Sequence, residues 1–463
     1  MITVIGGGPA GRFAASYLAG AGEKVRIIEK SGNLGGQCLK YGCMVTCGLN
    51  DAARNLNQLT KLRKLRVLDA GADAHVSMQN LWKELGAIQN TIFKVLDNEA
   101  NLAGIEVITG EVSLAGRDVY INGALLQQSD ADKILIATGS YPIIPKIKGI
   151  DLKGVYNPHT LQSLKEVPKD LLIIGGGVIA AEYAYIFSQF GSNVTVVCRS
   201  AFLRDKPERL IYCARKEMPD VSVREYTLVE ELKSAEGSDS SGFAVSAVLK
   251  SGKNREEIPC DAVIVASGLR PRSDNLKGIA LDDNGAVIVD DRFRTNVDGV
   301  YAAGDITGKV FLTPYARMQG IAAAKSILGE PVPKIPEYIP QSVKLFYEHT
   351  YCNMSSGSSE GEKAGETMRE FSLPAPAGPG SIWSVSERYT GSSSIRVDAK
   401  SGTVKGIHLS SPSSGTVGAY MAYLMEKSLN VKDFGSFLEV HPSTDGLYML
   451  VKYGDTLLTK ETK

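Results

Sequence analysis

The 463-residue chain lacks the features that mark nucleic-acid-binding, membrane-spanning and secreted proteins. Its 51 Lys and Arg residues are balanced by 51 Asp and Glu residues, so it has no basic excess to attract nucleic acid. No apolar run reaches the ~18 residues that a membrane-spanning helix needs. Residues 1–30 contain no secretory signal pattern. We therefore expect a cytoplasmic protein that binds neither nucleic acid nor a membrane.

Cysteine is scarce, with seven residues in the chain, which argues against a disulfide-stapled extracellular fold. Four of the seven are scattered, and we expect them to be small buried residues: Cys198, Cys213, Cys260 and Cys352. The other three lie close together and carry the more informative pattern: Cys38, Cys43 and Cys47.

Glycine, by contrast, is abundant, with 48 residues, and it marks a strand–turn–helix unit at the start of the chain. An apolar run over residues 2–5 leads into Gly6-x-Gly8-x-x-Gly11. Gly6 permits a tight turn, Gly8 lets the backbone approach a pyrophosphate, and Gly11 lets the following helix pack closely. A second apolar run ends at Glu29, where a carboxylate can bind an adenosine ribose. The unit predicts a dinucleotide site.

The same unit recurs 169 residues later, as Gly175-x-Gly177-x-x-Ala180. Such a repeat predicts two nucleotide-binding domains of similar fold. Two dinucleotide sites suggest a relay between a tightly held flavin and an exchangeable nicotinamide.

The end of the second unit differs from the end of the first. Cys198 occupies the position of Glu29 and is followed by Arg199, with Arg204 in the next loop. Guanidinium groups favour a 2′-phosphate where no carboxylate repels it, so we expect NADPH rather than NADH. The alternative is that both arginines are solvated loop charges.

The cysteine cluster follows Gly35 and Gly36, whose small size suits close contact with a flat ligand. Cys38 and Cys43 are close enough to form a small closed loop at the start of a helix, whose N-terminus stabilises a thiolate. Two other interpretations remain. The spacing C-x4-C-x3-C is near that of a plant-type iron–sulfur protein, and a zinc site would need a fourth ligand that we do not find, so we predict no metal.

Gly-Gly-x-Cys-x4-Cys after an N-terminal G-x-G-x-x-G resembles the FAD-dependent pyridine nucleotide–disulfide oxidoreductases. This group includes dihydrolipoamide dehydrogenase, glutathione reductase and mercuric reductase. Further segments are similar to the family's in the same order along the chain: residues 134–139 (ILIATG), 266–271 (ASGLRP) and 295–305 (TNVDGVYAAGD). The resemblance is strong over about three-quarters of the chain and looser after it.

The resemblance implies that Cys38 and Cys43 form a redox-active disulfide beside FAD and that Glu182 faces the same site. It implies that FAD is bound by the first unit and three later segments: Gly6, Gly8, Pro9, Ala10, Gly11, Glu29, Lys30, Gly36, Gln37, Val112, Ala137, Thr138, Gly139, Gly304 and Asp305. The nicotinamide nucleotide is expected at the second unit: Gly175, Gly177, Ile179, Arg199, Arg204 and Gly268.

Two departures from the family pattern concern the chemistry. The family's C-terminal His-Pro-Thr-x-x-Glu corresponds to residues 441–446, where Gly446 replaces the glutamate that orients the imidazole. The resemblance implies that His441 is an acid–base catalyst acting in the partner chain of a homodimer, with Asp445 as a possible substitute for the glutamate. The second departure is Cys47, which stands where relatives have a flavin-side lysine that pairs with the glutamate. Either the flavin potential differs from that of relatives, or Lys40 or another cation compensates.

We therefore predict an α/β protein with two three-layer Rossmann-like domains and a C-terminal α+β dimerisation domain. The expected boundaries are 1–150 and 271–335 for the two parts of the FAD domain, 151–270 for the NAD(P) domain and 341–463 for the dimerisation domain. Residues 382–385 are expected to be a strand. The predicted activity is two-electron transfer between NAD(P)H and a small-molecule or protein disulfide. The alternatives are a redox-signalling flavoprotein with little turnover and a mercuric-type metal reductase.

Overall fold

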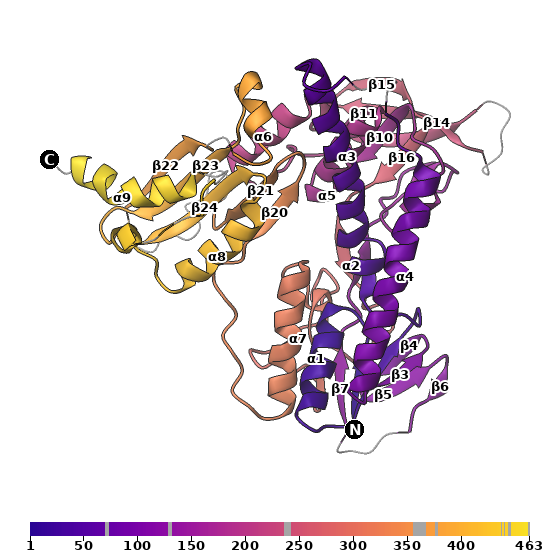
Figure 1. Ribbon diagram of the computed structural model, residues 1–463. Coiled ribbons are helices and arrows are strands. Elements are labelled where there is room, and N and C mark those ends of the chain that lie inside the picture. The colour runs from indigo at the N-terminus through magenta and orange to yellow at the C-terminus, as the bar shows by residue number, and fades with distance from the viewer. Residues whose placement is uncertain are drawn as a thin grey trace.

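The structure is a computed structural model that contains three sheet-based parts (Figure 1). It describes residues 1–69, 74–127, 132–235, 242–354, 367–375, 378–436, 438, 440–442 and 446–461. Two of the parts are built on parallel sheets and the third on an antiparallel sheet, so the predicted fold class is confirmed. The domain boundaries themselves stay a prediction.

The first part is a parallel sheet in the order β19-β7-β1-β2-β3. Its strands are short apolar runs: β1 (Ile2–Ile5), β2 (Val25–Glu29), β3 (Glu106–Thr109), β7 (Lys133–Ile136) and β19 (Val300–Ala302). Helices α1 (Pro9–Gly20) and α7 (Thr313–Ile327) pack together on one face. The other face is covered by a small sheet of four strands: β4 (Val112–Ala115), β5 (Asp118–Ile121), β6 (Ala124–Leu125) and β18 (Leu276–Lys277).

The second part repeats this plan with the order β12-β11-β10-β16-β9. Its parallel strands are β9 (Val155–Tyr156), β10 (Asp170–Ile174), β11 (Asn193–Val197), β12 (Ser222–Arg224) and β16 (Ala262–Val265). Helices α5 (Val178–Phe190) and α6 (Glu208–Glu217) share the core on one face. An antiparallel meander covers the other face: β13 (Leu228–Ser234), β14 (Ala244–Ser251) and β15 (Asn254–Pro259).

The glycine turns explain why the two parts look alike. Gly6 and Gly175 have φ angles of +109° and +137°, a region that disfavours residues with a side chain. A Cβ atom on Gly6 would lie 2.3 Å from the carbonyl oxygen of Ala137, and one on Gly175 would lie 2.2 Å from that of Ala266. Each turn therefore packs directly on the end of the neighbouring strand, as the repeat predicts.

Two long helices connect the parallel-sheet parts along one side of the molecule (Figure 1). Helix α3 (Cys43–Lys64) follows the short helix α2 (Gly36–Lys40) and packs against α5 of the second part. Helix α4 (Met78–Leu102) runs back toward the first part, where Leu96 and Ala100 are buried in its core. The pairing of β8 (Ser140–Pro142) with β17 (Leu269–Pro271) adds a second link.

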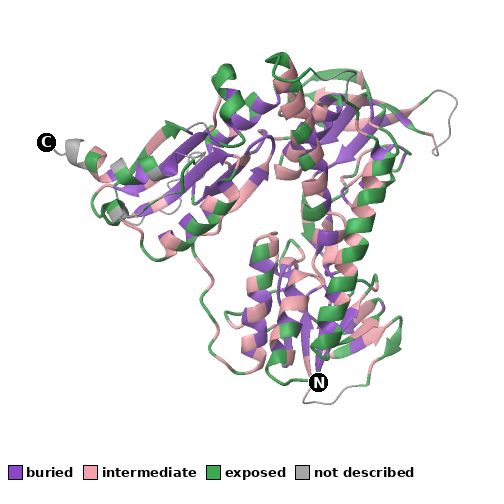
Figure 2. Ribbon diagram, viewed as in Figure 1, coloured by how far each residue is buried: buried purple, intermediate pink, exposed green. Residues whose placement is uncertain are grey.

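The third part is an antiparallel sheet in the order β20-β21-β24-β23-β22. Its strands are β20 (Gln341–Lys344), β21 (Glu348–Cys352), β22 (Met368–Pro374), β23 (Ser392–Asp398) and β24 (Val404–Ser411). Helices α8 (Ser414–Glu426) and α9 (Leu447–Glu461) pack on it. Buried residues are concentrated in this sheet and in the two parallel sheets (Figure 2).

The strand expected over residues 382–385 is wrong, because Ile382–Glu387 form the 3₁₀ helix η3. The main-chain N–H groups of Ser381 and Ile382 both donate to Gly378, and Ser384 donates to Ser381, which winds the segment into tight turns. Its apolar side chains point outward rather than to one sheet face, so β propensity alone misled the prediction.

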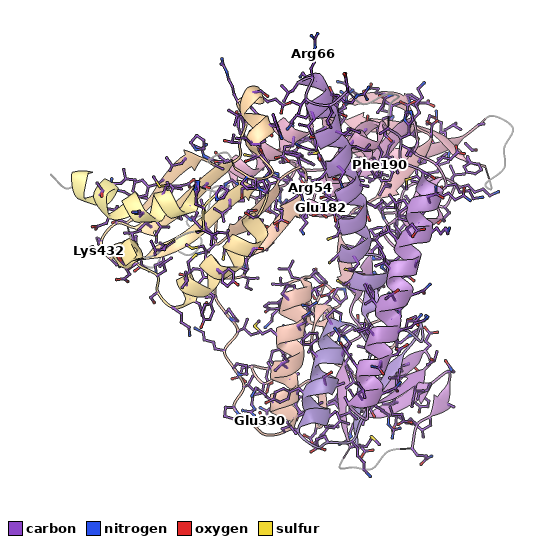
Figure 3. The ribbon with its side chains drawn as sticks, in the orientation of Figure 1. Arg54, Arg66, Glu182, Phe190, Glu330 and Lys432 are labelled. Carbon is purple, nitrogen blue, oxygen red and sulfur yellow. The ribbon has the colours of Figure 1, made fainter. Side chains whose placement is uncertain are left out.

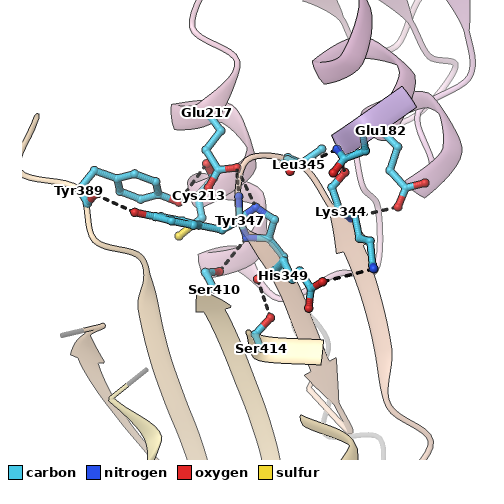
Figure 4. A network of polar contacts seen from close by, with 12 residues as sticks. Glu182, Cys213, Glu217, Lys344, Leu345, Tyr347, His349, Tyr389, Ser410 and Ser414 are labelled. Carbon is cyan, nitrogen blue, oxygen red and sulfur yellow. Dashed lines mark hydrogen bonds and ion pairs between the residues drawn. The ribbon is translucent and has the colours of Figure 1, made fainter. Parts of the chain in front are cut away.

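A buried polar network fixes the third part to α6 (Figure 4). The Glu217 carboxylate accepts hydrogen bonds from the Tyr389 hydroxyl at 2.8 Å and from the main-chain N–H of Tyr347 at 3.1 Å. It also pairs with Nε2 of His349 at 3.2 Å, and Nδ1 of His349 lies 2.8 Å from the Ser410 hydroxyl. A buried carboxylate is stable only with such partners, so this contact holds the two parts in a fixed orientation.

In the described part of the chain, no helix combines the length and the apolar character that crossing a membrane requires.

Candidate active site

A large cavity lies between the first and second parts and has a volume of ≈ 2290 Å³. Drug-sized ligands typically occupy pockets of ~300–1,000 Å³, so this cavity has room for more than one nucleotide. Both glycine turns and all three clustered cysteines line it. The two expected nucleotide sites and the thiols therefore share one connected space.

Most of the predicted site residues line this cavity: Gly6, Gly8, Pro9, Ala10, Glu29, Lys30, Gly36, Gln37, Cys38, Cys43, Val112, Ala137, Thr138, Gly139, Gly175, Gly177, Ile179, Glu182, Arg199, Arg204, Gly268, Gly304 and Asp305. Gly11 does not, and it serves packing instead, since a Cβ there would lie 2.0 Å from the Gly6 carbonyl oxygen. His441 is exposed and is not among the lining residues, and Asp445 lies outside the described residues. The roles of these residues in binding and catalysis stay predictions.

The first glycine turn forms a cradle without side chains. A Cβ atom on Gly36 would lie 2.7 Å from the Cα atom of Gly8, so the two backbones touch at the cavity floor. Helix α1 begins there and no side chain caps its N-terminus. Its free N–H groups suit a phosphate, and so this end fits the pyrophosphate of FAD.

Glu29 closes the adenosine end of the cradle. Its carboxylate accepts hydrogen bonds from the Gly7 N–H at 2.8 Å and from the Ser31 hydroxyl at 2.6 Å, and Lys40 lies 3.4 Å away. Burial opposes ionisation, but these hydrogen bonds and the Lys40 charge outweigh it and lower the pKa of Glu29. An ionised carboxylate here can accept hydrogen bonds from ribose hydroxyls.

Asp305 and its partners line the deeper part of the same half. The Ser140 hydroxyl donates to Asp305 at 2.6 Å, and the Gln37 amide donates to Ser140 at 2.6 Å. Burial raises the pKa of Asp305, although these hydrogen bonds oppose the rise. His159, which was not predicted from the sequence, also lies here: its Nε2 is 3.1 Å from the Gln37 side chain, and its ring packs at a tilt against Tyr41. Polar groups that converge in a buried wall fit the hydroxyl-bearing chain of FAD.

The thiol cluster lies where α2 ends and α3 begins. Cys38 belongs to α2, Cys43 is the first residue of α3, and Cys47 lies one turn further along the helix. No side chain caps the N-terminus of α3. Cys43 Sγ lies 3.8 Å from the Thr313 hydroxyl. The structure therefore directs a helix N-terminus at the predicted redox pair, as the sequence pattern indicated.

Cys38 and Cys43 titrate as a pair. Both are free thiols, joined by a hydrogen bond that lowers the pKa of Cys38 to about 6, while burial opposes the change. The same hydrogen bond, together with burial, raises the pKa of Cys43. Because the two sulfurs share one proton, the pair carries one thiolate near neutral pH. That thiolate is the form that attacks a disulfide.

The proposal that Lys40 compensates at the position of Cys47 is wrong. The Lys40 ammonium pairs with Glu29 and with the Ser31 hydroxyl, at the adenosine end of the cradle. Its charge therefore helps to lower the pKa of Glu29. The pKa of Cys47 is raised, mainly by burial. The sequence could not reveal this, because the Lys40 side chain pairs with residues of the preceding unit.

Glu182 lies on α5 where that helix faces α3 and β20 (Figure 3). Burial raises its pKa to about 7, and a hydrogen bond from the main-chain N–H of Lys344, at 3.0 Å, opposes the rise. The carboxyl therefore changes its charge near neutral pH, in the wall that also contains Cys43 and Cys47.

The second glycine turn carries the groups expected to bind a nicotinamide nucleotide. No side chain caps the N-terminus of α5 after Gly177, and Arg199 is exposed at the cavity edge. Arg204 pairs with Asp205 at 3.0 Å. Cys198 is buried against Gly176, so no carboxylate occupies the position that Glu29 has in the first unit. Lys206, which the sequence analysis missed, also lines this end of the cavity.

The four scattered cysteines are buried, as predicted. Among the residues that the structure describes, no group of three or more His, Cys, Asp and Glu side chains is arranged to hold a metal ion.

Sequence comparison settles the family. Residues 1–320 match the family described as pyridine nucleotide-disulphide oxidoreductase. The chain belongs to this family. It is therefore a flavoprotein oxidoreductase with FAD, NAD(P) and a redox-active disulfide, in keeping with the predicted resemblance.

Individual relatives cover three-quarters or more of the chain at low identity. The chain is 27% identical over 452 residues to a dihydrolipoyl dehydrogenase of Bacillus subtilis, covering 96% of this chain and 95% of the relative. It is 29% identical over 367 residues to a soluble pyridine nucleotide transhydrogenase of Mycobacterium bovis, covering 76% and 75%. The HOCl-induced flavoprotein disulfide reductase RclA of Escherichia coli matches with a TM-score of 0.83 and 26% identity, over 97% and 100% of the two chains.

The thiol geometry predicts an unusual pH dependence for the reduced protein. Alkylation by iodoacetamide should rise with pH through a midpoint of about 6, because the thiol–thiol hydrogen bond stabilises a thiolate. The measurement is the rate of Cys38 modification between pH 4 and 10, followed by mass spectrometry. In Cys43→Ala, which lacks the hydrogen-bond donor, the midpoint should move up toward an ordinary thiol value of ~8.5. A midpoint near that value in the unsubstituted protein would contradict the assignment.

Proposed function

We propose that the protein is a homodimeric, FAD-dependent enzyme that transfers two electrons from NADPH to a small-molecule or protein disulfide. One observation carries this proposal: the hydrogen-bonded Cys38–Cys43 pair lies in the cavity that joins the two glycine turns. Such a pair can take electrons from one nucleotide site and exchange them with a disulfide. The cysteine usage is consistent with a reducing compartment such as the cytoplasm.

The first glycine turn, Glu29 and Asp305 would hold FAD, which would supply two-electron transfer between the nicotinamide and the Cys38–Cys43 disulfide. Those electrons break the disulfide and leave a thiol and a thiolate. The Cys38 thiolate attacks the substrate disulfide, forms a mixed disulfide and releases the first substrate thiolate. Cys43 then attacks the Cys38 sulfur, which releases the second substrate thiolate and restores the disulfide. The partner subunit's His441 would supply protons to the leaving thiolates.

NADPH is the proposed donor because of the charges at the second turn. Arg199 and Arg204 lie at the cavity edge beyond a position that carries no carboxylate. A 2′-phosphate would gain charge-assisted hydrogen bonds there, whereas the 2′-hydroxyl of NADH would not.

A redox-signalling role with little turnover is the second candidate. Cys47 stands where the family pattern has a lysine, and Gly446 replaces the glutamate that would orient His441. Both changes would slow turnover without removing the flavin or the thiols.

The central test replaces the sulfur expected to face the flavin. Reduction of the wild-type protein by two electrons should produce a long-wavelength absorbance band. With FAD bound, the single negative charge that the coupled pair shares is expected on Cys43, the sulfur nearer the oxidised ring, with the shared proton on Cys38. Cys43→Ser should lose this band and all NADPH-dependent reduction of lipoamide, glutathione disulfide and DTNB.

Cys47→Ser is the matched control, since it removes one sulfur from the same helix. It should keep both the band and the turnover. If Cys43→Ser retains the band, the pair is wrongly assigned. If the wild-type protein shows the band but reduces none of the three disulfides, the signalling role is favoured.

The arginines generate a separate prediction about the donor. Replacing Arg199 and Arg204 by alanine should raise the KM for NADPH about tenfold or more with little change in kcat, since a charge-assisted hydrogen bond contributes ~1.5–3 kcal/mol. The KM for NADH, measured in the same steady-state assay, serves as the internal control and should stay constant. An equal rise for both nucleotides would refute 2′-phosphate recognition by these side chains.

A further inference from the structure

The main chain of β20 is held between the two helices that carry Cys47 and Glu182. The N–H of Lys344 donates to Glu182 on α5 at 3.0 Å. On the other side, the buried Asn50 amide of α3 donates to the carbonyl oxygens of Lys344 and Leu345 at 3.1 and 3.2 Å. Asn50 lies about one helical turn after Cys47, on the same side of α3. These three hydrogen bonds fix the position of Lys344 beside the thiols.

The side chain of Lys344 continues from this fixed point along the cavity wall. The main-chain bond to Glu182 and the extended lysine side chain are both visible in Figure 4. The ammonium pairs with Glu348 at 3.3 Å, and 41% of the side chain is exposed. Cys47, Glu182 and Lys344 all line the cavity. A cation from the C-terminal part is thereby brought to the redox wall.

Electrostatic interactions show which groups this cation acts on. The Lys344 charge opposes the rise in the pKa of Cys47 and the rise in the pKa of Glu182, both of which are caused by burial. Burial lowers the pKa of Lys344 itself, but Glu348, Cys47 and Glu182 together raise it. The ammonium thus stays charged, and it favours the anionic form of each neighbour.

We infer that Lys344 is a positioning residue that supplies the positive charge for the redox site from outside the helix that carries the thiols. This inference rests on the proposed function, since it concerns the flavin and thiols together. Reduction adds negative charge to the site, so a nearby cation favours the reduced state. The position that Cys47 occupies on α3 carries no charge, and β20 provides one in its place.

The inference also couples the C-terminal part to the redox chemistry. Because β20 begins the antiparallel sheet, the position of that sheet determines where the ammonium lies. A displacement of the sheet would move a charge relative to the flavin and would change its potential.

Lys344→Met tests the inference because it removes the charge and keeps a long side chain and the main-chain hydrogen bonds. The holoenzyme of this variant should have a more negative flavin reduction potential. At a fixed ratio of NADPH to NADP⁺, its ratio of reduced to oxidised flavin should therefore be roughly tenfold smaller than in the wild-type protein. Lys344→Arg should keep the wild-type ratio. Lys233→Met is the matched control, since it removes an exposed lysine paired with Glu257 in the second part, and it should change nothing.

A relocated charge provides the decisive comparison. Lys344→Met combined with Cys47→Lys places a lysine on α3 instead of β20, and the ratio should return toward the wild-type value. The pH midpoint for alkylation of Cys47 is a second readout in the single variants; it should rise in Lys344→Met and stay constant in Lys344→Arg. Lys344→Gln replaces Lys344→Met if the latter does not retain FAD.

Two outcomes would overturn the inference. One is an unchanged ratio of reduced to oxidised flavin in Lys344→Met and in Lys344→Gln. The other is a shift that neither Lys344→Arg nor the relocated lysine restores, which would indicate a structural role. Failure of the proposed function gives a different result: the wild-type protein would then reduce no disulfide with NADPH, whatever the ratio of reduced to oxidised flavin in the variants.

Discussion

The whole site depends on two close approaches between main chains. At Gly6 and at Gly175 the chain leaves a strand, turns with positive φ and passes so near the adjacent strand that no side chain fits. Each turn leaves an uncapped helix N-terminus facing the cavity. Two anionic nucleotides can therefore enter one space, and α2 and α3 place the thiols in the same space.

The charges around the thiols come from separate parts of the chain. A helix N-terminus and a neighbouring thiol favour a thiolate at Cys38, while burial keeps Glu182 poised between its two forms near neutral pH. The cation comes from the C-terminal sheet, through Lys344. Lys344 lines the cavity from β20 of the third part, and the buried network around Glu217 helps to hold that part against α6.

The sequence predicted those features that local pattern determines. Glycine spacing at the two units gave the parallel sheets, their repeat and the cysteine-bearing segment between them. Prediction from the sequence failed where interacting residues are distant in sequence, and where the strand propensity of a segment competes with local turns. Lys344 lies about three hundred residues from Cys47, and no spacing links the two. Lys40 looked available because it lies close in sequence, yet it pairs with Glu29. Residues 382–385 had strand composition but wind into η3 because Gly378 accepts two successive N–H groups.

In the proposed function, electrons pass from a flavin to the Cys38–Cys43 disulfide. Anaerobic reductive titration of the oxidised holoenzyme with dithionite tests this most directly, because it counts the electrons that each bound flavin site consumes. A flavin and a disulfide are each two-electron couples, so full reduction is expected after about four electrons per FAD. Full reduction after about two electrons per FAD, with no reactive thiol at Cys38 or Cys43 before or after the titration, would contradict electron transfer to this disulfide.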